Sequence, residues 1–189
     1  MKHGRKAALK RDAQALRKEM ELSILDPLEC FDLCNLLGLE IISFRNLIEK
    51  HVTAKPLLQA IYDSGKGRTI SAITVCRYGS SIILYNETHA DTRIKNTVVH
   101  EVAHHFLGHK PMSSIKGNQL FTRGDSLEED EEANHFSSCL LIPRAGILQL
   151  MKKGADIEAV AEHYGVSREL AQMRYNLSGI KRQLSYIYR

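Results

Sequence analysis

The segment His100–His109 reads H-E-V-A-H-H-F-L-G-H, and its start fits the pattern H-E-x-x-H. On an α-helix, His100 and His104 lie slightly more than one turn apart, so both imidazoles leave the same face and can bind one ion. Glu101 lies about 100° around the helix from His100, where its carboxylate can reach a metal-bound water without binding the metal. We therefore predict a zinc site of the peptidase type, with His100 and His104 as ligands and Glu101 as general base.

The residues around this pattern favour a buried helix. Asp91 and Thr92 are candidate N-caps, and Gly108 is a natural C-terminal stop. Most other positions are apolar, namely Ile94, Val98, Val99, Val102, Ala103, Phe106 and Leu107. A helix that is apolar nearly all round is expected to be buried. Buried imidazoles and carboxylates are costly unless they are paired or coordinated, which favours a metal site over a core helix with satisfied histidines.

A third ligand is expected downstream, where six of the eight residues 125–132 are acidic. Such a run is usually a solvated face, but this one enters a helix with an apolar inner side. That side would carry Ala133, Phe136, Ser137, Leu140 and Leu141. Asp130 shares it by helical spacing, whereas Glu131 points about 100° away. We predict Asp130 as the third ligand, with Glu131 as the alternative, and Asn134 as a hydrogen-bond partner of a ligand imidazole.

The two motifs together resemble the ImmA/IrrE family of zinc metallopeptidases. That family carries H-E-x-x-H and later E-x-x-A-N-x-F-A-x-x-L-L-x-P, and residues 130–143 read D-E-E-A-N-H-F-S-S-C-L-L-I-P. The segments Asp26-Pro27, Leu37–Ile41, Tyr85-Asn86 and Ala161–Ser167 are similar to the family's flanks. The family's ligand Glu falls on Asp130, which is one methylene shorter but still offers zinc an oxygen.

The resemblance implies an activity and a partner. Members of this family are gluzincin-like H-E-x-x-H enzymes that cut a helix-turn-helix repressor and so switch on a phage, mobile-element, stress or defence operon. The family's catalytic Glu falls on Glu101. Two other functions stay open: a non-cleaving module that binds a repressor, toxin or DNA with a structural or degenerate metal site, and a zinc hydrolase that is not a peptidase. An intact Glu101 argues against a structural site, which has no use for a general base.

Composition limits the other possibilities. The 189 residues with 43% apolar content suit one packed domain, or one with a small appendage. No apolar stretch is long enough to cross a membrane, and the basic N-terminus lacks the apolar region of a signal peptide. The four cysteines form no C-x-x-C pair, which favours reduced thiols. We therefore expect a cytoplasmic protein that does not contact membranes.

Sequence patterns predict a mostly helical α+β fold in three segments. Residues 1–22 would form a basic N-terminal helix, residues 23–152 the zinc metallopeptidase core, and residues 153–189 a helix-turn-helix-like C-terminal segment. Within the core, a helix from Asp26-Pro27 to Leu37 precedes a small antiparallel or mixed β-sheet beside the H-E-x-x-H helix. The strands are expected at Leu39–Phe44, Thr69–Tyr78 and Ser81–Asn86, with a turn at Gly79-Ser80, whereas Lys110–Arg123 is expected to be an irregular loop.

The C-terminal segment carries the signals of two short helices around a turn, with Gly165 in the turn and Ser167 as the cap of the second helix. Arg168 and Arg174 would be its phosphate contacts if it bound DNA. Glu169 dilutes that charge, and we favour a packing role for this segment. DNA, including single-stranded DNA, is still a candidate activator or ligand because both ends of the chain are basic.

No spacing selects a second oxyanion donor among the remaining histidines and Tyr85. His105, His109 and His135 are all near the two motifs in the sequence. We expect His109 to face solvent rather than to take part in catalysis.

Overall fold

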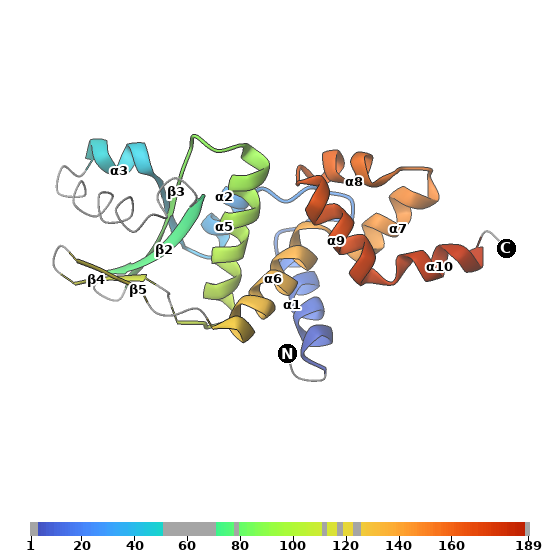
Figure 1. The fold of residues 1–189 in the computed structure, drawn as a ribbon, viewed down its shortest axis with the longest axis horizontal. Coiled ribbons are helices and arrows are strands. Elements are labelled where there is room, and N and C mark those ends of the chain that lie inside the picture. The colour runs from blue at the N-terminus through green and yellow to red at the C-terminus, as the bar shows by residue number, and fades with distance from the viewer. Residues whose placement is uncertain are drawn as a thin grey trace. The chain divides into compact units, whose positions relative to one another are not determined.

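The computed structural model describes residues 4–50, 71–77, 80–110, 113–116, 119–122 and 126–187, and its fold is mostly helical and α+β, as predicted (Figure 1). Its contacts divide the chain into two compact units, Cys30–Ala133 and Met1–Glu29 with Asn134–Arg189. The boundaries of these two units differ from the boundaries of the three predicted segments. The functional division into three segments stays a prediction. Among the described residues, no helix is long and apolar enough to cross a membrane.

The unit Cys30–Ala133 holds the sheet and the predicted site. Its elements are α2 (Cys30–Leu36), β1 (Glu40–Ser43), α3 (Phe44–Lys50), β2 (Ala72–Arg77), β3 (Ser80–Tyr85), α5 (Asp91–Phe106), β4 (Ser113–Lys116), β5 (Gln119–Thr122) and the start of α6 (Leu127–Leu141). The sheet has the order β1-β3-β2-β4-β5. It is mixed: β1 is parallel to β3, β2 is antiparallel to β3 and parallel to β4, and β4 is antiparallel to β5.

Side chains alternate across this sheet, as the strand geometry requires. One face of β2 and β3 packs on α3, where Phe44, Leu47, Val75 and Leu84 form a buried cluster. The other face of β2 carries Thr74, whose hydroxyl hydrogen-bonds a side chain of α5. The register of β2 therefore decides which of its residues meets the H-E-x-x-H helix.

The structure confirms the predicted strands around residues 39–44, 69–78 and 81–86, although Thr69, Ile70, Tyr78 and Gly79 lie outside the described residues. Three other expectations need correction. The segment Lys110–Arg123, expected to be an irregular loop, contains the paired strands β4 and β5. The helix expected from Asp26-Pro27 begins only at Cys30.

The third correction concerns α5. It begins at Asp91 with Ala90 as N-cap, so neither Asp91 nor Thr92 is a cap. Ile94, Val98, Val99, Val102 and Ala103 are buried as expected, but Phe106 is 39% exposed. The helix is therefore amphipathic and not apolar all round, which leaves its polar side for the candidate site.

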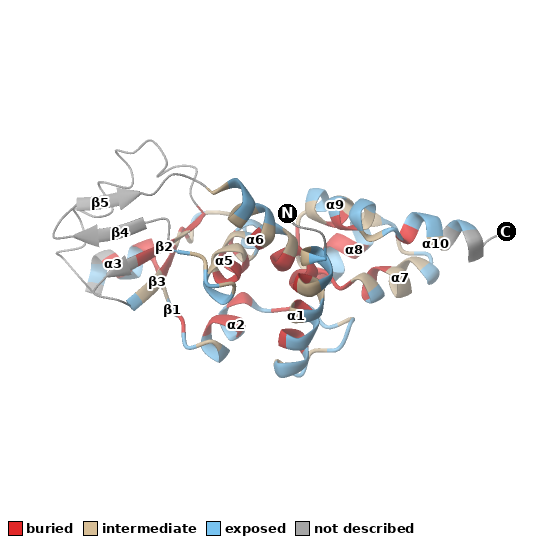
Figure 2. Ribbon diagram, turned by 90° about the horizontal axis from the view of Figure 1, so that it is seen from below, coloured by how far each residue is buried: buried red, intermediate tan, exposed pale blue. Residues whose placement is uncertain are grey.

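The second unit is helical where the structure describes it. It comprises α1 (Arg5–Glu19), the end of α6, α7 (Arg144–Lys152), α8 (Ile157–Tyr164), α9 (Arg168–Ser178) and α10 (Ile180–Ile187). Buried and exposed residues alternate along α1 with a helical period (Figure 2). The buried Arg17 of α1 donates hydrogen bonds to the carbonyls of Leu140 (2.8 Å), Ser23 (2.6 Å) and Asp26 (2.6 Å). It thereby ties the end of α6 to the segment after α1.

The helix pair α8 and α9 has the predicted turn glycine and the predicted cap at Ser167, and Asp156 caps the first helix as well. Asp156 accepts from the amide of Ala159, Ser167 accepts from the amide of Leu170, and Gly165 has a φ of 59° in the turn between them. Arg174, a phosphate contact only if this segment bound DNA, does not face solvent. It is 3% exposed, and its Nε donates to the carbonyl of Ile142. This favours the packing role for the pair.

Candidate metal centre

The helix α5 places its two motif histidines side by side. Their rings lie 4.7 Å apart between centroids and are nearly perpendicular, and the two Nε2 atoms are 3.1 Å apart. Spacing by four residues on one helix face produces this pairing. The side chain of His100 is 22% exposed and that of His104 is 12% exposed, so both are largely buried but still reach solvent.

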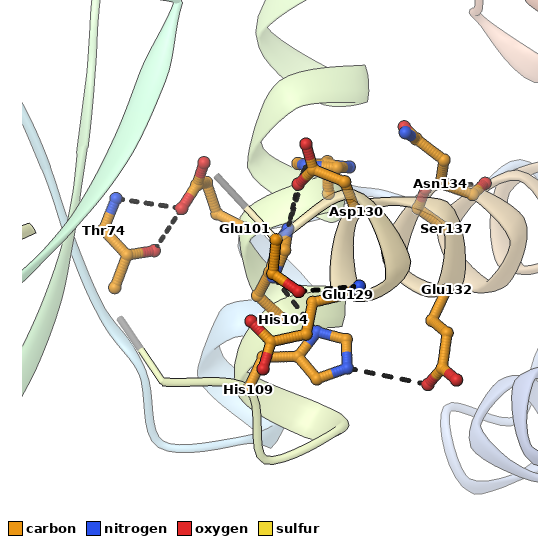
Figure 3. Close-up of polar contacts among 11 residues, drawn as sticks. Thr74, Glu101, His104, His109, Glu129, Asp130, Glu132, Asn134 and Ser137 are labelled. Atoms are coloured by element: carbon orange, nitrogen blue, oxygen red, sulfur yellow. Dashed lines mark hydrogen bonds and ion pairs between the residues drawn. The ribbon is translucent and has the colours of Figure 1, made fainter. Parts of the chain in front are cut away.

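Asp130 completes the cluster from the first turn of α6. Its Oδ1 lies 3.2 Å from Nε2 of His104 and 3.8 Å from Nε2 of His100, and the carboxylate points at the imidazoles (Figure 3). The start of α6 is fixed by Ser126, whose hydroxyl accepts from the amide of Glu129 and whose carbonyl accepts from the amide of Asp130. Acidic residues in this first turn also suit the positive end of the helix dipole.

The distances suit a zinc ion. Bonds of about 2.0–2.2 Å in a tetrahedral arrangement place two ligand atoms roughly 3.3–3.6 Å apart. The three pairs here measure 3.1, 3.2 and 3.8 Å, on either side of that range. Within the part of the chain that the structure describes, His100, His104 and Asp130 form the group of side chains able to share a metal ion. Among the described residues, the group offers two nitrogens and one oxygen, which is also the number of protein ligands in a catalytic zinc site.

The general base predicted at position 101 is held by the sheet. Thr74 of β2 donates twice to Oε2 of Glu101, from its amide at 3.0 Å and from its hydroxyl at 2.6 Å. Burial raises the pKa of the Glu101 carboxyl, the two Thr74 donors oppose that rise, and the nearby Asp130 adds to it. Both donors contact Oε2, so Oε1 is the oxygen through which Glu101 can take a proton.

Burial also lowers the pKa of His104, and the neighbouring His109 acts in the same direction, while Asp130 opposes both. A lowered pKa favours the neutral imidazole, which is the form that binds metals.

Sequence reasoning missed two contacts here. Thr74 was not singled out, and His109, expected to face solvent, is only 8% exposed, with its Nδ1 lying 3.1 Å from Nδ1 of His104.

Two further expectations for α6, which concern Glu131 and Asn134, stay predictions. Glu131, the alternative ligand, is an exposed residue and is not part of the metal-binding group found among the described residues. Asn134 is exposed, and its carbonyl accepts from the hydroxyl of Ser137 at 3.3 Å. The inner side of α6 is as predicted, because Ala133, Phe136, Ser137, Leu140 and Leu141 are all buried.

A cavity of about 310 Å³ opens beside the centre. It is lined by Thr74, Ser81, Glu101, His104, His105, Gly108, His109 and Lys110. Ligand sites commonly measure about 300–1,000 Å³, so this cavity lies at the lower end of that range. Glu101 and His104 both line this space.

A histidine pair one turn apart, a carboxylate at ligand distance and a second carboxylate in the adjoining cavity are the parts of an H-E-x-x-H metallopeptidase centre. The comparison with known families leads to the same class. The profile of the peptidase M78 family, described as the IrrE N-terminal-like domain, matches residues 54–176, almost two thirds of the chain. The chain therefore belongs to this metallopeptidase-like family, and the predicted ImmA/IrrE membership is confirmed. No curated protein and no solved structure matches it significantly.

Proposed function

We propose that this protein is a zinc-dependent, site-specific endopeptidase whose substrate is a helix-turn-helix repressor. The observation that carries the proposal is the convergence of His100, His104 and Asp130 at metal-ligand distances beside the carboxylate of Glu101. Membership of the peptidase family supports the reaction class. The repressor as substrate, and the release of a phage, stress or defence operon as the outcome, rest on the resemblance to ImmA/IrrE proteins.

Each residue then has a defined task. His100, His104 and Asp130 would hold the ion, and zinc bound by them would polarise the scissile carbonyl and make a neighbouring water more acidic. Glu101 takes the proton of the attacking water on Oε1 and passes it to the leaving amine. Thr74 keeps the carboxylate oriented by holding Oε2 from two directions. The cavity beside Glu101 receives an extended segment of the substrate.

Intact-mass spectrometry tests this function. The zinc-loaded protein is incubated with candidate helix-turn-helix repressors encoded near its own gene, beside a Glu101→Gln control. The proposal predicts two fragments whose masses sum to the repressor plus one water, and no fragments with Glu101→Gln. A stable complex without fragments would support a non-cleaving regulatory module instead. Cleavage that persists in Glu101→Gln would refute the general-base role.

A further inference from the structure

The end of α5 brings the histidine after the helix back onto the helix. The amide of His109 donates to the carbonyl of His104 at 2.9 Å, and the amide of Gly108 donates to the carbonyl of His105 at 3.0 Å. Gly108 has a φ of +71°. These three features make a Schellman C-cap, in which the residue after the glycine packs against the last turn. The backbone therefore sets the side chain of His109 beside His104.

An apolar contact usually fills this place in a Schellman cap, but here two polar rings meet. Nδ1 of His104 lies 3.1 Å from Nδ1 of His109, and the ring centroids are 5.0 Å apart. On its other side, Nε2 of His109 lies 3.6 Å from Oε2 of Glu132, beyond a direct hydrogen bond but within ion-pair distance (Figure 3). The two side chains of this pair are 8% and 13% exposed, so little water competes for these contacts.

Only one arrangement of protons satisfies these contacts together with the metal cluster. Nε2 of His104 faces His100 and Asp130, so as a ligand it must carry no proton. The proton of His104 is then on Nδ1, which donates to His109. Nδ1 of His109 must accept, and its own proton is on Nε2, directed at the Glu132 carboxylate. The donor and acceptor roles of the four ring nitrogens therefore determine the tautomers of both histidines.

We propose that His109, oriented by Glu132, is a positioning residue that fixes His104 in the tautomer and orientation in which Nε2 can bind the metal. This inference rests on the proposed metal centre and adds residues that the H-E-x-x-H pattern does not contain. Partners of this kind behind a ligand histidine typically change metal affinity by about 10- to 100-fold. His109 does not touch the reacting atoms through this contact; it acts through His104.

The test compares two isosteric replacements of His109. In Asn the amide oxygen occupies the place of Nδ1 and can still accept from His104, whereas in Gln the amide lies one bond farther out, near the place of Nε2. Zinc dissociation constants are measured by chelator competition for the parent, His109→Asn, His109→Gln and His109→Ala. His105→Ala, which removes an exposed histidine one residue from His104, is the matched control.

We expect zinc affinity to fall by about 10- to 100-fold in His109→Ala and His109→Gln, and to stay within about threefold of the parent in His109→Asn and His105→Ala. Glu132→Gln should lose less, because its contact is the longer one. Equal affinities for His109→Asn and His109→Gln would overturn the inference even if His109→Ala fails to fold. A parent that binds no zinc would instead overturn the proposed function.

A second readout follows the hydrogen bond between the two rings directly. In the zinc-loaded parent, ¹H–¹⁵N spectra of the imidazoles should show a protected proton on Nδ1 of His104, and this signal should persist in His109→Asn. In His109→Gln the protection should be lost. A protected Nδ1 proton that is the same in both variants would show that His109 only packs against the helix end, whatever the zinc affinities are.

Discussion

Replacement of Thr74 by Val isolates one of the two hydrogen bonds that hold the general base. Val has nearly the shape of Thr and keeps the amide that donates to Oε2 of Glu101 at 3.0 Å, but it lacks the hydroxyl that donates at 2.6 Å. A hydrogen bond to a charged group contributes about 1.5–3 kcal/mol. Its loss should shift the protonation equilibrium of Glu101 toward the acid form by about 10- to 100-fold, because 1.4 kcal/mol corresponds to a factor of ten.

The direction follows from the contacts. Burial already raises the pKa of Glu101, and the Thr74 donors counter that rise, so removal of one donor raises the pKa further. The assay is a ¹³C titration of the Glu101 carboxyl in zinc-free protein, with Thr74→Ser as the control that retains the hydroxyl. Once a substrate is known, the acidic limb of kcat/KM should move to higher pH in Thr74→Val. The same Glu101 titration in parent and Thr74→Val would refute the role given to this threonine.

Three further changes have expected outcomes. Glu101→Gln should keep its zinc, measured by elemental analysis, while kcat/KM falls by about 10²- to 10⁴-fold through loss of the general base; a smaller fall would point to another base. Arg17→Met should lower the free energy of unfolding by roughly 2–4 kcal/mol in urea titrations, because three carbonyls lose a charged donor, whereas the exposed Lys18→Met should not. Arg168→Glu should leave DNA affinity in low-salt filter binding unchanged, because the other candidate phosphate contact of α9, Arg174, is buried and the helix packs rather than binds DNA; a tenfold loss would support DNA binding by α9.

The H-E-x-x-H helix and Asp130 could be found from the sequence because helical periodicity is a local property. His100 and His104 share a face by spacing alone, and Asp130 was chosen over Glu131 by the same argument. The hairpin of β2 and β3 was equally readable, since β-branched residues flank a glycine-serine pair. In each case a short stretch of chain carries the whole signal.

The parts that were missed depend on a turn or on distant contacts. Thr74 meets Glu101 across 27 positions, and only the register of β2 decides that this residue faces α5. His109 follows Gly108, and a glycine that ends a helix does predict that the next residue folds back onto the last turn. The pattern at positions 108 and 109 therefore indicates a partly buried histidine rather than one that faces solvent.

The strands in Lys110–Arg123 and the burial of Arg174 were missed for different reasons. The Gly117-Asn118 pair between two short β-prone stretches is a hairpin signal, but Pro111 and Gly117 together also favour an irregular loop. Arg174 looked like a surface cation because arginine is seldom buried. The carbonyl of Ile142, which accepts from it, becomes a neighbour only through tertiary packing.

The central claim is a three-ligand zinc centre, and the most direct test is the zinc content per chain of freshly purified protein. The parent, His104→Ala, Asp130→Ala and the control Glu131→Ala are compared by elemental analysis, after zinc has been offered and excess removed. We predict about one zinc per chain in the parent and in Glu131→Ala, and none in the two ligand variants. A parent without zinc, or zinc retained by Asp130→Ala and lost by Glu131→Ala, would contradict the centre described here.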